Sequence, residues 1–142
     1  MFLQCGGNIG EVGNKVGVAL VLNSLGYVAS KEGDYAAARA LYEESLSFFR
    51  EVGDKRGVAE GFEGVATALR NMGEVRRAAT LLAAAGALRE SIGLPLTGIK
   101  QVEYDTEVAK ARAQMGEEPF AAAWAQGRTL SWEQALALAL RH

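Results

Sequence analysis

The sequence has little of what most catalytic and metal sites need, with one cysteine and one histidine among 142 residues. A single cysteine cannot form a disulfide within the chain, which favours a reducing compartment. The histidine, His142, is the last residue, where chain ends usually fray, so a catalytic triad and a multi-histidine metal site are both disfavoured. We therefore expect no catalytic residue, no metal and no cofactor.

An excess of charge is missing as well, because 15 lysines and arginines stand against 17 aspartates and glutamates. Nucleic-acid binding needs a strongly basic surface, so that class is disfavoured. The adjacent carboxylates Glu43/Glu44 and Glu117/Glu118 would diverge by about 100° on a helix, which does not suit a pair of acid and base catalysts. We expect a chain that is not an enzyme and does not bind nucleic acid.

Long hydrophobic runs are also absent. The longest uncharged apolar run, AATLLAAAGAL at 78–88, is shorter than the stretch of about 20 residues that spans a bilayer. The opening MFLQCGG has neither the basic segment nor the length of a secretory signal. These features predict a cytoplasmic chain without a membrane segment.

What the sequence does contain is an internal repeat. EVGNKVGVAL at 11–20 returns as EVGDKRGVAE at 51–60, and residues 11–50 align with residues 51–90 without a gap. Ten of these forty aligned positions are identical. A period of this length is typical of stacked supersecondary units.

Each repeat is predicted to be a helical hairpin. Apolar residues recur at three- and four-residue spacing before and after the segment KEGDY, as two amphipathic helices require. Within that segment Gly33 can take the left-handed backbone form that ends a helix, and Asp34 can cap the next one. Asn14 and Asp54 are expected to cap the first helix of each unit in the same way.

The spacing of large and small residues resembles the tetratricopeptide repeat family, in its form with a 40-residue period. The family's pattern falls on Leu22, Leu25, Gly26, Ala29, Ala38, Tyr42 and Arg50, and again on Phe62, Val65, Ala66, Leu69, Ala78, Leu82 and Glu90. The resemblance implies an all-α fold, a right-handed α-solenoid of two stacked hairpins at 16–50 and 51–91. Residues 1–15 are expected to be a leader or loop.

Residues 97–142 break the period and are expected to form helices that cap the second hairpin. Thr97 can cap a helix from about 98 to 115, a short helix should close at Gly127, and Ser131 with Gln134 has the spacing of a capping box. The run at 78–88 has no polar face, so it must be covered on a second side. The tail is the predicted cover.

Three aromatic residues of this tail, Phe120, Trp124 and Trp132, occur at helical spacing among alanines and leucines. We expect them to be core. The alternative is a cage for a small ligand, which would make the chain a sensor segment of a transcriptional regulator.

The amino-acid sequences of residues 76–96 and 117–140 also resemble the C-terminal segments of bacterial signalling ATPases and LuxR-type transcription activators. Those proteins place tetratricopeptide arrays behind a nucleotide-binding domain. This chain carries neither the ATPase motifs nor a recognisable DNA-reading helix, so the resemblance implies a role in bacterial regulation or signalling without either activity.

The leading prediction is therefore a non-enzymatic scaffold that binds a protein or peptide. First helices of stacked hairpins line the concave side of a solenoid, and removing the core positions leaves a set of polar candidates for this groove. They are Asn23, Tyr27, Ser30, Lys31, Glu60, Glu63, Thr67, Arg70 and Asn71. The alternative is that these polar side chains are simply solvated.

A second surface is predicted at the first repeat, where apolar residues exceed what one hairpin partner can cover. These residues are Val18, Val21, Leu25, Val28, Phe48 and Phe49. Exposed apolar patches usually mark interaction sites. We expect either a homodimer through this surface or a place for further repeats of a longer array.

Overall fold

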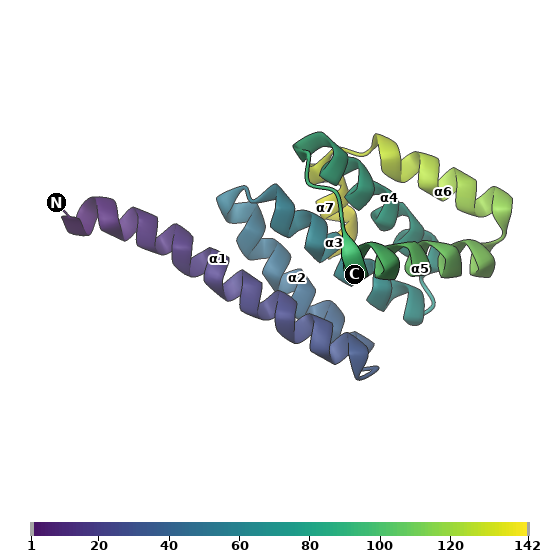
Figure 1. Cartoon of the computed structure of the whole chain (residues 1–142), viewed down its shortest axis with the longest axis horizontal. Helices are drawn as coiled ribbons and strands as arrows, with labels where there is room; N and C mark the ends of the chain where they lie inside the picture. The colour runs from purple at the N-terminus through teal and green to yellow at the C-terminus, as the bar shows by residue number, and fades with distance from the viewer. Residues whose placement is uncertain (1, 142) are drawn as a thin grey trace.

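The computed structural model describes the backbone of residues 2–141 and the side chains of residues 12–141. Over this range the chain is all-α and has no strand, as predicted (Figure 1). The helices are α1 (Phe2–Lys31), α2 (Tyr35–Val52), α3 (Lys55–Asn71), α4 (Val75–Ile92), α5 (Gly98–Met115), α6 (Glu117–Thr129) and α7 (Trp132–Leu140). Helices α1 and α2 form one hairpin, α3 and α4 form the next, and α2 packs against α3.

The repeat is visible in the turns, which carry a glycine every twenty residues. Gly33, Gly53, Gly73 and Gly93 all have a positive φ, between 68° and 93°, a backbone form that favours glycine. The predicted caps after two of them are confirmed. Asp34 accepts a hydrogen bond from the Ala37 amide at 3.2 Å, and Asp54 accepts one from the Gly57 amide at 3.1 Å.

Glycines also let α3 approach α2 closely. A Cβ added at Gly61 would lie 2.4 Å from Leu46, and one at Gly64 would lie 2.3 Å from Tyr42. Because both partners are buried, neither glycine has room for a side chain. The side chains that enter this gap belong to the main core of the molecule, which continues between α3 and α4.

The first helix is longer than predicted. Residues 2–15 were expected to be a leader or loop with Asn14 as the helix cap, but α1 runs from Phe2 through Gly13 and Asn14. At the equivalent Gly53 the chain reverses so that α3 can pack on α2. No described helix precedes α1 to force such a turn, and glycine in a helix costs only about 1 kcal/mol.

One stretch within the described helices, Val12–Lys31 of α1, is long and apolar enough to cross a membrane by length and composition. The expectation of no membrane segment rested on the run at 78–88 alone. The buried core helix of a soluble protein and a signal sequence pass the same test. In this structure 22% of the window is buried, and α1 packs along α2. Gly26 faces the Tyr42 ring, and the Ser45 hydroxyl donates to the Ala19 carbonyl at 3.1 Å.

The second side of α4 is covered by the tail, as predicted. Helix α6 packs along α4 much as α3 packs along α2. Gly127 does not end α6. It lies inside the helix and allows close approach, since a Cβ there would be 2.1 Å from the Thr80 carbonyl oxygen. Phe120 is buried and stacks on Trp124 with ring centroids 5.5 Å apart, in a cluster with Ala79 and Ala123.

Of the two caps predicted for the tail helices, one forms its side-chain bonds and the other does not. The capping box of Ser131 and Gln134 at the start of α7 is confirmed. Thr97 precedes α5 but makes no side-chain capping bond. At the other end of α7, free backbone carbonyls accept hydrogen bonds from arginines of both hairpins. Arg77 binds the Leu138 carbonyl at 2.8 and 3.0 Å, and Arg39 binds that of Arg141 at 3.0 Å, which ties the tail to both repeats.

Candidate binding cavity

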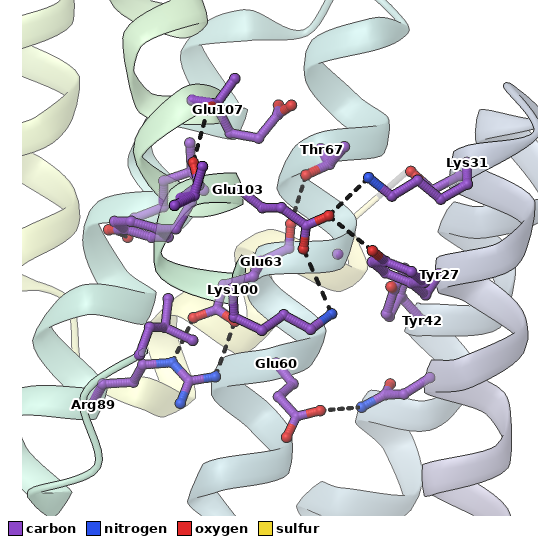
Figure 2. A pocket seen from close by; sticks show the side chains of 18 of the residues that line it. Tyr27, Lys31, Tyr42, Glu60, Glu63, Thr67, Arg89, Lys100, Glu103 and Glu107 are labelled. Atoms are coloured by element: carbon purple, nitrogen blue, oxygen red, sulfur yellow. Dashed lines mark hydrogen bonds and ion pairs between the residues drawn. The ribbon is translucent and has the colours of Figure 1, made fainter. Parts of the chain in front are cut away.

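A cavity of about 810 Å³ lies between α1, α3 and α5, with the 95–97 segment at its edge (Figure 2). Seven of the nine residues predicted for the groove line it, and Arg70 and Asn71 do not. The seven are Asn23, Tyr27, Ser30, Lys31, Glu60, Glu63 and Thr67. These seven residues lie on α1 and α3, which form two walls of the cavity.

The third wall is α5, and its side chains bind some of the predicted groove residues. Arg70 is buried, and its guanidinium binds the Glu107 carboxylate at 2.6 and 3.3 Å and the Gln114 side chain at 3.0 Å. The groove is therefore not open along its whole length. Asn71 is exposed, and its amide donates to the Thr67 carbonyl of its own helix at 2.8 Å.

Glu103 of α5 joins that helix to α1 across the cavity (Figure 2). Its carboxylate accepts a hydrogen bond from the Tyr27 hydroxyl at 2.8 Å and lies 2.8 Å from the Lys31 ammonium. The ammonium of Lys100 lies 3.9 Å from the centre of the Tyr27 ring. The hydrogen bond with Lys31 holds the pKa of Glu103 below its usual value, against the opposing effect of burial.

Glu63, in the middle of α3, is paired with α4 rather than free for a ligand. Arg89 binds its carboxylate through two nitrogens, at 2.6 and 3.0 Å, and also donates to the Leu94 carbonyl at 3.2 Å. Burial raises the pKa of Glu63, and the bonds from Arg89 oppose that rise. With arginine always protonated, this two-pronged geometry keeps the pair ionised at neutral pH.

Tyr42 reaches the cavity from α2, by passing between α1 and α3. Its ring lies against Gly26 and Gly64, where a Cβ would come within 2.9 and 2.3 Å of it. The hydroxyl makes no hydrogen bond with residues 12–141. Burial, followed by the charge of Glu60, raises the pKa of Tyr42 far above its usual value, so the phenol stays neutral.

Asn23 and Glu60 form the remaining polar pair of the cavity. The Asn23 amide donates to the Glu60 carboxylate at 3.4 Å, which is long for a hydrogen bond. The cation nearest to Glu60 is Arg56, at 3.7 Å, with a side chain that is 68% exposed. Asn23 itself is 7% exposed, and its Oδ1 is buried without a partner.

The sequence analysis missed Tyr42, Arg89, Lys100 and Glu103 as cavity residues. Tyr42 had been assigned to the core by the repeat pattern, and Arg89 lies on a second helix. Glu103 and Glu107 are four residues apart on the helix that was predicted at 98–115. That spacing places both carboxylates on one face of α5 and could have identified a helix that binds the basic groove residues.

The other predicted sites are placed as follows. Val18, Val21, Leu25 and Val28 are exposed along one side of α1, Phe48 is half-buried, and Phe49 is fully buried. Phe49 therefore does not belong to the self-association surface, because it fills the space at Gly57.

The proposed aromatic cage is not assembled. Trp132 lines a separate cavity of about 240 Å³ that neither Phe120 nor Trp124 reaches. In the described residues no three metal-binding side chains are grouped as a metal site.

Comparison with known proteins agrees with the repeat. A family model described as tetratricopeptide repeat matches residues 17–91, more than half of the chain. Proteins from Mycobacterium tuberculosis and Mycobacterium bovis, provisionally named HTH-type transcriptional regulators, are 32% identical over 114 residues. The match covers 80% of this chain, but the chain spans 13% of the length of those relatives. No solved structure matches the chain.

Proposed function

The chain belongs to the tetratricopeptide repeat family, and on that premise we propose that it is a non-enzymatic module that binds a protein or peptide segment in the cavity between α1, α3 and α5. The supporting observation is that residues of both repeats, chosen from the sequence as groove residues, line one cavity together with α5. Side chains of both charge signs and the Tyr27 ring offer what an extended segment needs for polar and apolar contacts.

The process we propose is bacterial regulation in the cytoplasm. The mycobacterial relatives carry names of transcriptional regulators, and they align with this chain over a small part of their length. What is proposed is the interaction step, in which a rigid pair of hairpins presents a shaped cavity to a partner.

Catalysis is not part of the proposal, because two of the cavity's carboxylates are already bound by side chains of the chain itself. Glu63 is held by Arg89, and Glu103 by Lys31 and Tyr27. A general base needs a free carboxylate within reach of its substrate. The two best-placed carboxylates do not offer that.

We also propose that two copies meet through the exposed apolar side of α1. Val18, Val21, Leu25 and Val28 recur at three- and four-residue spacing and therefore form one stripe. A second copy would bury the same stripe by two-fold symmetry. Of the four stripe residues, Val28 also lines the cavity, whereas Val18, Val21 and Leu25 do not.

Photo-cross-linking tests the cavity directly. A photoreactive amino acid at Thr67, inside the cavity, is expected to capture a defined partner segment, whereas the same residue at the exposed position 44 on α2 is not. Mass spectrometry of the adduct identifies the segment. Equal capture at both positions, or capture only at position 44, would contradict the proposed function.

A further inference from the structure

Three basic residues in or beside the cavity have acidic partners within the chain. Arg70 is bound by Glu107, Lys31 by Glu103, and Arg89 by Glu63. Two of these three carboxylates come from α5. These three charges are therefore paired before any partner arrives. Lys100 and Lys110 of α5 also line the cavity, and the Lys100 ammonium lies 3.8 Å from the Glu103 carboxylate.

The acceptors at the other end of the cavity are not matched in this way. Glu60 lies ten residues before Arg70 on α3, which is about 15 Å along the helix axis. In Figure 2, Glu60 and Glu107 lie at opposite ends of the view, with Glu103 between them. The α5 carboxylates bind at the Arg70 end, and the Glu60 carboxylate has only the long bond from Asn23 and the exposed Arg56.

Two further groups beside Glu60 lack a partner. The Oδ1 of Asn23 is a buried acceptor without a hydrogen bond, although this residue lines the cavity. The Tyr42 hydroxyl also lines the cavity and makes no bond with the described residues. Of these two groups, the Asn23 Oδ1 is the one that is buried without a hydrogen bond. Such an atom is costly to bury, so it indicates a place where a donor is missing.

Carboxylates dominate the electrostatic field at the Tyr42 hydroxyl. After burial, the negative charges of Glu60, Glu103 and Glu63 raise the pKa of Tyr42. A positively charged donor would be attracted by that field and would also supply the missing hydrogen bonds. An acidic group would meet repulsion at the same place.

We propose that the Asn23–Glu60–Tyr42 end of the cavity binds a basic side chain, the guanidinium of arginine or the ammonium of lysine, carried by the partner segment. Both groups bring several N–H donors and a positive charge, which suits one carboxylate and two neutral acceptors. Arg56 swings away from Glu60 into solvent when the ligand arrives. This inference rests on the proposed function, because it names the chemistry of the segment that enters the same cavity.

Four pentapeptides test the inference, with the form acetyl-Ala-Ala-Xaa-Ala-Ala-amide and arginine, lysine, citrulline or glutamate at Xaa. Binding is followed by NMR titration of the full chain, using backbone amides of α1 and α3 and the side-chain amide of Asn23. The arginine and lysine peptides should shift the signals around Asn23 and Glu60. The neutral citrulline and the acidic glutamate peptides should bind at least about tenfold more weakly, since charge-assisted bonds are about twice as strong as neutral ones.

Matched variants locate the effect. Glu60→Gln keeps the shape of the side chain and removes its charge. It should weaken binding of the arginine peptide by about tenfold or more. Glu44→Gln also removes one negative charge, but from an exposed position outside the cavity. It should leave the affinity for the arginine peptide unchanged. Arg56→Gln removes the competing cation and should tighten binding.

Equal affinity for the arginine and citrulline peptides, or full affinity in Glu60→Gln, would overturn the inference. Preference for the glutamate peptide would overturn it too, while leaving the proposed function standing. If cross-linking at Thr67 captures a segment and neither basic peptide shifts the cavity amides, the inference alone is wrong. If the cross-linking and all four titrations fail, both proposals are wrong.

Discussion

The two hairpins repeat one sequence pattern but differ in what surrounds them. In the second hairpin Val58 and Val65 are completely buried, while their counterparts in the first, Val18 and Leu25, are 45% and 49% exposed. The difference is one of neighbours. Helix α3 has α2 on one side and α4 on the other, whereas α1 has α2 alone along most of its length. Apolar periodicity thus identifies a helix face, and stacking decides whether that face is core.

The strongest way to break this comparison is a charge at equivalent positions. Val65→Asp should place an unpaired carboxylate in the core and cost about 4–5 kcal/mol or more, enough to unfold the chain. Leu25→Asp, at the matching exposed position, should change the free energy of unfolding by no more than about 0.5 kcal/mol. Urea unfolding followed by circular dichroism measures both, and similar losses in the two variants would refute the difference in burial.

Exchanging the residues at equivalent positions of the two repeats should give the next largest change in stability. Position 61 is glycine where position 21 is valine. Gly61→Val should destabilise the chain by about 1–3 kcal/mol through overpacking against Leu46. The reverse change, Val21→Gly, should cost about 0.5 kcal/mol or less, the difference in helix propensity between valine and glycine alone. Thermal unfolding of the pair measures this, and a neutral Gly61→Val would mean that α2 and α3 are less closely packed than described.

Ion pairs sharpen the contrast between the enclosed and open regions. The pair of Arg70 with Glu107 is largely buried, and the pair of Lys15 with Glu51 is half exposed. Glu107→Gln should leave the Arg70 charge incompletely paired and cost about 1–3 kcal/mol, seen as faster hydrogen exchange in α5. Glu51→Gln should cost less than about 1 kcal/mol. Unchanged exchange in α5 would show that this pair does not hold the helix in place.

The open side of α1 predicts an effect on assembly with little effect on folding. If two copies meet there, the mass from sedimentation equilibrium should rise with concentration, and Val21→Glu should keep the chain monomeric. Its unfolding free energy should stay within about 0.5 kcal/mol, because the side chain is exposed. A wild-type chain that is monomeric at high concentration would exclude this contact.

The smallest predicted effect is a pH dependence from Glu103. Because its folded-state pKa is lowered, it stabilises the fold above its unfolded pKa, and this contribution is lost as the pH falls below about 4.3. Glu103→Gln should be less stable than wild type at neutral pH, with the gap closing in acid. Unfolding curves at pH 7 and in acid test this, and a gap independent of pH would show that charge is not the cause.

Much of the fold follows from the sequence, because the forty-residue period, the turn glycines and the caps at Asp34 and Asp54 are local signals. The bounds 98–115 were also predictable. What local signals did not contain is where α5 lies, since this depends on Glu103 and Glu107 finding Lys31 and Arg70 across the groove. The predicted loop was wrong over residues 2–15 for a related reason. The glycine and asparagine there resemble a turn, but no described helix folds back on them.

The most direct test of the binding site maps the partner segment found by cross-linking at Thr67 onto the chain by NMR chemical-shift changes. We predict changes concentrated in the cavity-lining residues of α1, α3 and α5, with Asn23, Glu60 and Tyr42 among them. Changes centred instead on Val18, Val21 and Leu25, which do not line the cavity, or on the tail around Trp132, would contradict a binding site in the cavity.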